Sequence, residues 1–435
     1  VPCAGPVLST IIVLGAKEHV NLETVLVTLA FSIGASVPLI VIALAGSALV
    51  ERARALRAKG PLLRKIGGAV LIVMALAIWF NAFNSLQTDV PGYTNALQQH
   101  VEGSASVRKQ LDNLSGTKSA DGSLTKCVPS DSTLEMCGLA PNFTDITAWL
   151  NTPGGKPLTI QELRGKVVLI DFWTYSCINC ERTLPHVEAW YNRYKNDGLV
   201  VVGVHTPEFG FEHVVSNVRA MSKALGVDYP VAVDDNYGTW NAYANEYWPA
   251  DYLVDANGVI RHEEFGEGNY ALTENLIRGL LVAAHPGLKL PPRTNVPDLT
   301  PTQPTNPETY VGYDRLQYLD DARAPTPNLP TAFRFPAYLS PDYFSFSGLW
   351  TDHAEEATAD KQAKLELSFQ DQDVYLVMGG AGTVTVSDGN GLAPTTIHVQ
   401  GVPKLYTLFH SKTTAAGTLK MTFTPGVQAY DFTFG

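Results

Sequence analysis

The chain has 435 residues, 45% of them hydrophobic, a length that allows two or three domains with separate cores. The formal net charge is −11. Over residues 1–83, seven Lys and Arg stand against three Asp and Glu, so this segment carries +4 and the remainder −15. The acidic remainder excludes the basic face that nucleic-acid binding requires.

Two apolar runs near the N-terminus have the length of membrane-spanning helices. Residues 22–50 and 67–86 contain no charged residue except Glu23 at one edge. The loop between them, residues 51–65, has six basic residues and one acid, and the positive-inside rule places such a loop in the cytoplasm. We therefore expect the chain after Asn84 to lie outside the cytoplasm. The alternative is a solvated basic loop between buried helices of a soluble domain.

Cys3 lies among helix-breaking residues, in the segment Val-Pro-Cys-Ala-Gly-Pro that opens the sequence. Such interruptions of a membrane helix are tolerated where the backbone faces protein or a cavity. From the residues alone, Cys3 is equally well a buried thiol beside a kink or a working thiol. Because the sequence begins at Val1 inside an apolar segment, we expect an N-terminal part to be missing from it.

Residues 87–138 are polar, with scattered Gly, Ser and Asp, and we expect a partly helical spacer outside the cytoplasm. Disulfides persist outside the cytoplasm, and Cys127 and Cys137 in this spacer predict a local structural disulfide. A second, shuttling redox pair is the alternative.

The segment 168–185 holds the most informative motif, Val-Leu-Ile-Asp-Phe-Trp-Thr-Tyr-Ser-Cys-Ile-Asn-Cys-Glu-Arg-Thr-Leu-Pro. An apolar strand leads into Cys177 and Cys180, which open a helix. Unpaired N–H groups and the helix dipole at that place stabilise a thiolate on Cys177. A lone Cys-x-x-Cys also fits half of a zinc site, but no second pair follows at metal-site spacing. We predict a redox pair and no metal.

Apolar strands alternate with amphipathic helices over residues 139–285, which predicts an α/β domain. The helix after Cys180 presents apolar residues at helical spacing, which predicts core packing: Leu184, Val187, Trp190 and Tyr194. The strands are expected in four runs, followed by a hairpin turn at Asn257-Gly258: Val167–Ile170, Leu199–Val204, Tyr229–Val233 and Asp251–Asp255. His205 ends a central strand, where a hydrogen-bonded loop histidine is favoured over a proton partner, and His186 is given no catalytic role.

A proline-rich linker, residues 286–304, separates this domain from a run of short alternating segments over residues 305–435. Many strands of period two with frequent turns predict an antiparallel β-sandwich of the jelly-roll type. Such folds can bind carbohydrate through exposed aromatic residues, and Trp350, Tyr343 and Tyr406 are candidates. The alternative places these side chains in the sandwich core.

The segment around the cysteine pair resembles the active site of the thioredoxin superfamily, in its membrane-anchored TlpA-like branch. The resemblance makes Cys177 the attacking cysteine and Cys180 the resolving cysteine. It makes Asp171 a buried acid beneath the pair, able to relay the proton that Cys180 loses, and Pro185 the proline that kinks the helix. Pro249, in Tyr-Trp-Pro-Ala-Asp, matches the cis-proline that precedes a strand in this family.

The resemblance also implies a substrate groove formed by Trp173, Ser176 and Trp248. Ser176 departs from the family pattern, which usually has Trp or another bulky residue before the first cysteine. This departure concerns the form of the groove and leaves the cysteine chemistry unchanged.

The segment around Cys3 resembles the second cysteine motif of the CcdA/DsbD family, whose members carry electrons across the bilayer with one cysteine in each of two inverted repeats. The partner cysteine would precede Val1. The order of domains resembles that of the DipZ-type thiol:disulfide interchange proteins of actinobacteria, with residues 1–86 as the C-terminal part of the membrane domain.

The resemblance implies a multi-pass protein of the bacterial cell membrane that reduces protein disulfides outside the cytoplasm, with cytochrome c biogenesis as one setting. Electrons would come from a cytoplasmic thioredoxin-like donor through the membrane cysteines, and the redox-active disulfide would need no cofactor. A disulfide oxidase or isomerase with the same cysteine pair is the first alternative. A tethered module that binds glycan or protein is the second.

Overall fold

We describe the protein from a computed structural model. It describes residues 127–321, 323–388 and 394–435. Cys3 and the two apolar runs expected to span a membrane lie outside these residues, as does most of the expected spacer. None of the helices in the described ranges is long and apolar enough to cross a membrane.

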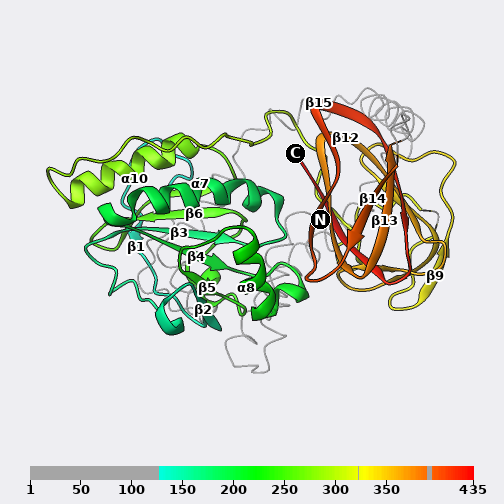
Figure 1. Ribbon diagram of the computed structural model, residues 1–435, viewed down its shortest axis with the longest axis horizontal. Coiled ribbons are helices and arrows are strands. Elements are labelled where there is room, and N and C mark those ends of the chain that lie inside the picture. Colours follow the sequence, from blue (N-terminus) through cyan, green and yellow to red (C-terminus); the bar gives the residue numbers. More distant parts are fainter. Residues whose placement is uncertain (1–126, 322, 389–393) are drawn as a thin grey trace, which may run out of the picture. The chain divides into compact units, whose positions relative to one another are not determined.

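The first domain is built on a mixed sheet with the strand order β1-β7-β6-β3-β4-β5-β2 (Figure 1). The strands are β1 (Gly138–Leu139), β2 (Ala148–Leu150), β3 (Val167–Trp173), β4 (Leu199–His205), β5 (Val231–Val233), β6 (Ala250–Val254) and β7 (Val259–Phe265). β3, β4 and β5 are parallel, whereas β6 and β7 run antiparallel to their neighbours. Every residue of β3 is buried. This confirms the prediction, made from the continuous apolar run, that this strand is covered on both faces.

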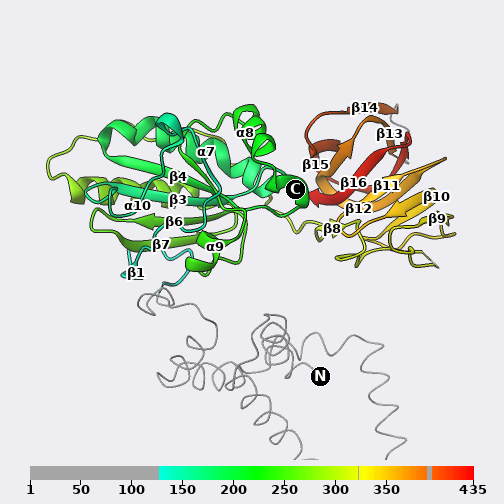
Figure 2. The ribbon, with the colours of Figure 1, turned by 90° about the horizontal axis from the view of Figure 1, so that it is seen from below.

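Helices cover both faces of this sheet (Figure 2). They are α7 (Ile178–Tyr194), α8 (Val215–Ala224), α9 (Gly238–Ala242) and α10 (Tyr270–Ala284), with short 3-10 turns η3 (Pro153–Gly155), η4 (Lys195–Asp197) and η5 (Gly210–His213). α7 and α10 pack with Leu169 and Trp173 of β3, and Trp240 of α9 packs with Phe172 on the other face. The predicted core positions of α7 are all buried, so its helical period was predicted correctly.

Residues 286–304 contain no helix or strand, as expected of a proline-rich linker. The second domain is all β, with every strand pair antiparallel among its described residues. Its strands are β8 (Thr309–Tyr310), β9 (Pro330–Phe333), β10 (Phe344–Asp352), β11 (Ala357–Ala359), β12 (Lys364–Gly380), β13 (Gly382–Asp388), β14 (Thr395–Val399), β15 (Lys404–Phe423) and β16 (Val427–Phe434).

Among the short alternating segments expected over residues 305–435, two pairs lie in continuous strands, so their prediction as separate strands is wrong. Segments 364–369 and 374–377 both belong to β12, and segments 405–408 and 418–423 both belong to β15. These two long strands pair along most of their length. The sequence between the segments contains a register shift between Asp371 and Asp373, which bends the ladder without ending it. β12 also pairs with β10 and β16, which are connected through β11, so the sheet closes on itself.

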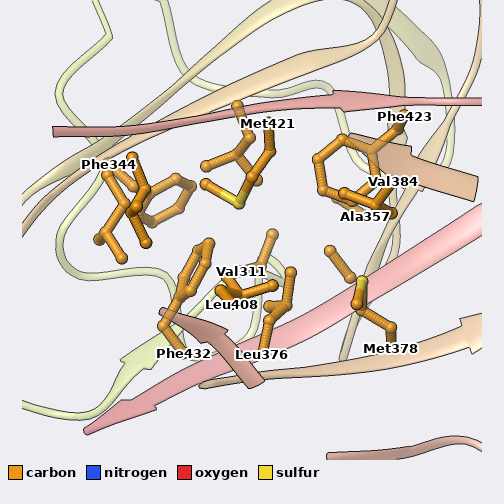
Figure 3. Packing of buried hydrophobic residues seen from close by; sticks show 14 of the residues in the cluster. Val311, Phe344, Ala357, Leu376, Met378, Val384, Leu408, Met421, Phe423 and Phe432 are labelled. Carbon is orange, nitrogen blue, oxygen red and sulfur yellow. The ribbon is translucent and has the colours of Figure 1, made fainter. Parts of the chain in front are cut away.

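The inside of this closed sheet is apolar. Side chains from facing strands meet there, among them Phe344, Leu376, Met421 and Phe432 (Figure 3). Trp350 belongs to the same cluster and is 0% exposed, so it is a core residue and not a candidate for glycan binding. Tyr343 and Tyr406 are partly exposed, and their carbohydrate binding stays a prediction.

Candidate functional site

Cys177 and Cys180 lie where β3 gives way to α7. Cys177 is the N-cap of α7, and its Sγ accepts a hydrogen bond from the N–H of Cys180 at 3.4 Å. Both cysteines are free thiols; Cys177 is partly exposed and Cys180 is buried. A partly exposed sulfur at a helix N-terminus is accessible to an incoming disulfide. The geometry gives Cys177 the place of an attacking thiol and Cys180 that of a resolving one.

The Cys180 thiol is difficult to deprotonate. Burial raises the pKa of the Cys180 thiol well above its ordinary value, and the hydrogen bond and charge of Cys177 and the charge of Asp171 raise it further. Because a thiolate is the reactive species in thiol–disulfide exchange, Cys180 needs a base close by to become a nucleophile.

Asp171 is placed to be that base. It points from β3 to the face covered by α7, and burial raises its pKa to about 7, although a hydrogen bond from Tyr229 OH to Oδ2 at 3.1 Å opposes the rise. Gly203, opposite Asp171 on β4, makes room for this contact, since a Cβ there would lie 2.8 Å from the Tyr229 ring and from Trp173 Nε1. A carboxyl group with a pKa near neutrality can both accept and release a proton at physiological pH.

Ser176 is hydrogen-bonded to Glu212, a residue to which the sequence analysis gave no role. Ser176 Oγ and N–H donate to Glu212 Oε1 at 2.8 and 3.3 Å, and the N–H groups of Glu208 and Phe209 donate to Oε2. Burial raises the pKa of Glu212 to about 7 against these hydrogen bonds. Glu212 therefore fixes the residue before Cys177. In the sequence, Glu212 is distinguished only as an acidic residue in the loop after β4, seven positions after His205.

The expected substrate groove is only partly present. Trp173 is fully buried and Ser176 is 3% exposed, so neither offers a surface to a substrate, which corrects that expectation. Trp173 packs edge-on against His205, with 5.3 Å between ring centroids. Trp248 is partly buried and packs against Trp240. The bond between Trp248 and Pro249 is cis, as the motif predicts.

The two histidines near the site are structural. His205 is buried between Trp173 and Tyr175, and burial lowers its pKa to about 3, so it is neutral at physiological pH. His186 stacks on Tyr270 with 3.6 Å between ring centroids. Neither arrangement provides a proton partner for the cysteines.

Cys127 and Cys137 are joined by a disulfide. The loop that it closes runs along β7, where Ser130, Glu135 and Cys137 donate backbone hydrogen bonds to that strand. This pairing with an edge strand, with Cys137 itself buried, favours a structural disulfide over a shuttle. Among the described residues, Cys127, Glu135 and Cys137 also form the only group close enough to hold a metal ion. Their sulfur atoms are bonded to each other and leave no thiolate for a metal.

Comparison with protein-family models gives two matches. Residues 139–263 match the AhpC/TSA family, and residues 306–435 match a family described as the thioredoxin-like C-terminal domain.

Individual relatives match over different lengths. Protein DipZ of Mycobacterium tuberculosis and of Mycobacterium bovis is 44% identical over 440 residues, which is all of this chain and 63% of the relative. Thiol-disulfide oxidoreductase YkuV of Bacillus subtilis is 30% identical over 141 residues, 32% of this chain and 93% of YkuV. Thiol-disulfide oxidoreductase ResA of Halalkalibacterium halodurans is 27% identical over 134 residues, 30% of this chain and 70% of ResA. The chain thus spans less than two thirds of DipZ.

Proposed function

We propose that this chain reduces disulfides of other proteins with Cys177 and Cys180. The chain belongs to the thioredoxin-like thiol–disulfide oxidoreductases, and all of its residues match part of DipZ. The observation that carries the proposal is the asymmetry of the pair. Cys177 is partly exposed at a helix N-terminus, and Cys180 is buried above a carboxyl group whose pKa is about 7.

The reaction has two exchange steps. The Cys177 thiolate attacks one sulfur of a substrate disulfide, forms a mixed disulfide and releases the other sulfur, which takes up a proton as a thiol. Cys180 then gives its proton to the Asp171 carboxylate and attacks Cys177 Sγ. The mixed disulfide breaks, the second substrate thiol leaves, and a Cys177–Cys180 disulfide remains. Two electrons pass to the substrate, and the cysteine pair itself is the redox group.

The setting of this reaction is a further part of the proposal. Residues 1–86 anchor the protein in a bacterial cell membrane, with the domains at 139–285 and 305–435 outside the cytoplasm. Electrons from a cytoplasmic thioredoxin-like donor pass through Cys3 and a partner cysteine in the membrane domain. Exported proteins with disulfides are the substrates, with cytochrome c maturation as one setting. These statements rest on the resemblance of the sequence to DipZ-type proteins and on the apolar runs.

The reduction potential of the Cys177–Cys180 pair tests the direction of electron flow. A value of about −230 to −270 mV is expected of a reductant, whereas about −120 mV would make the protein an oxidant and refute the proposal. Cys177→Ser should abolish reduction of a disulfide-containing protein. Cys180→Ser should retain a covalent mixed disulfide with it. A Cys180→Ser protein that releases its substrate normally would contradict the two-step reaction.

A further inference from the structure

Three carboxyl groups form a row across the sheet beneath the cysteine pair. Asp171 on β3 stands directly opposite Asp251 on β6, and Asp251 stands directly opposite Glu264 on β7. Residues directly opposite each other in antiparallel strands share a face and have Cβ atoms about 5 Å apart. The row therefore leads from the resolving cysteine toward β7, on the face that α7 and α10 cover.

The row is buried and incompletely hydrogen-bonded. Asp171, Asp251 and Glu264 are 1%, 7% and 4% exposed. In each of them one buried oxygen has no hydrogen-bond partner: Asp171 Oδ1, Asp251 Oδ1 and Glu264 Oε2. Leaving a buried acceptor unpaired costs about 1–3 kcal/mol. Three neighbouring groups of this kind under a redox pair therefore call for a functional reason.

The outer end of the row reaches the protein surface. Glu264 Oε1 accepts hydrogen bonds from Ser130 Oγ at 2.7 Å and from Asn269 Nδ2 at 3.1 Å, and both of these residues are exposed. His262 Nε2 lies 3.6 Å from Glu264 Oε2. Ser130 belongs to the loop that the Cys127–Cys137 disulfide closes.

The proton affinities along the row suit transfer in both directions. The pKa of Asp171 is about 7. Burial, followed by the charges of Asp171 and Glu264, raises the pKa of Asp251 well above its ordinary value and so favours its protonated form. Burial also raises the pKa of Glu264, but the nearby His262 and the hydrogen bonds from Ser130 and Asn269 together lower it below its ordinary value.

We infer that Asp251 and Glu264 form a proton path that connects Asp171 with the surface beside Ser130. The path rests on the proposed function, because the proton that it carries is the one that Cys180 loses. Asp171 receives this proton from the Cys180 thiol. Asp251 then takes a proton from Asp171 as it gives its own to the Glu264 carboxylate, which releases it to solvent. One proton enters and one leaves, and no electron moves along the row. The spacing between neighbours suits a short-lived hydrogen bond or one bridging water.

Mixing the reduced full chain with Ellman's reagent tests the path, in a Cys3→Ser background that removes a competing thiol. The attack of Cys177 releases one coloured thiolate, and the resolving attack of Cys180 releases a second. At about pH 6, below the pKa of Asp171 of about 7, most Asp171 carries a proton that must leave before Cys180 can be deprotonated. At about pH 8 most Asp171 is already ionised, and the path is not needed for a single turnover.

Asp251→Asn should therefore slow the second release by at least about tenfold at pH 6, a conservative figure beside the roughly 100-fold at which proton-transfer contributions typically begin. At pH 8 the slowing should be less than about twofold. Glu264→Gln should act in the same direction, which keeps the test decisive if one variant folds poorly. Besides Asp171 and Glu264, Tyr229 faces Asp251, and its pKa lies well above the tested range because burial raises it.

Glu263→Gln is the matched control. Glu263 is a buried carboxyl whose pKa burial raises to about 7, next to Glu264 but on the opposite face of β7. It should leave both releases unchanged at both pH values. Equal slowing of Asp251→Asn at pH 6 and pH 8 would show a merely structural role and overturn the path, as would rates equal to those of the unsubstituted protein. If the unsubstituted protein gives only the first release, the cysteine-pair reaction itself fails.

Discussion

Asp171→Asn should stabilise the α/β domain at neutral and alkaline pH while it slows the resolving step. In the folded protein burial raises the pKa of Asp171 from 3.8 to about 7. Between these two pH values the folded state keeps a proton that the unfolded state has lost, so this group lowers the free energy of unfolding by about 1.4 kcal/mol for each pH unit. The total is about 4 kcal/mol, reached near pH 7 and constant above it. Asparagine does not titrate and still accepts the hydrogen bond of Tyr229.

Urea unfolding followed by tryptophan fluorescence measures this effect. The advantage of Asp171→Asn over the unsubstituted protein should grow by about 3 kcal/mol between pH 5 and pH 8, or by more than about 1 M in the urea midpoint. Asp228→Asn, at an exposed position of the same domain, is the control and should show no such growth. Parallel stability curves for Asp171→Asn and the unsubstituted protein would refute the argument, because they would mean that the Asp171 carboxyl is ionised in the folded protein at pH 5.

Two further predictions concern the residues that support the site. Glu212→Gln replaces a carboxyl group that accepts several hydrogen bonds by an amide with a single acceptor oxygen. It should slow the first release from Ellman's reagent several-fold, because the loop before Cys177 loses part of its support. An unchanged first release would show that Glu212 does not position Cys177. Arg315→Gln removes the ion pair with Glu208 at 2.8 Å, a loss of roughly 1 kcal/mol because Arg315 is about one-third exposed. Arg315→Gln should speed proteolysis of the linker, residues 286–304, about fivefold. Equal cleavage rates in Arg315→Gln and the unsubstituted protein would contradict a role for this ion pair in holding the two domains together.

The sequence allowed the strands and helices of the α/β domain to be predicted because their signals are local. β3 and β4 are uninterrupted apolar runs, and α7 has a clear helical period that starts at the cysteine motif. The redox pair Cys177 and Cys180 was predicted from the strand–Cys-x-x-Cys–helix motif. The roles of the two cysteines and of Asp171 were implied by the resemblance to the thioredoxin superfamily.

The remaining features depend on pairings between distant segments. Asp251 was expected only as the start of a strand, and Glu264 had no assigned role, because their places beside Asp171 depend on the register of three strands. Trp173 was expected in a substrate groove, and Trp350 was a candidate for glycan binding with the sandwich core as its alternative. Both are buried, because the sequence pattern does not reveal which face of a strand is covered. The long strands β12 and β15 were divided, since a bulge and a turn have similar sequence signals.

Glu208 and Glu212 join the second domain to Ser176, the residue before Cys177, through a short chain of hydrogen bonds. Arg315 Nη1 and Tyr310 OH donate to Glu208 Oε1 at 2.8 and 2.7 Å. The backbone N–H of Glu208 donates to Glu212 Oε2 at 2.6 Å, and Glu212 Oε1 accepts from Ser176. The two carboxyl groups thus serve different contacts from one loop. Since Glu208 reaches Glu212 only through its backbone, a change at Arg315 should disturb Cys177 less than a change at Glu212.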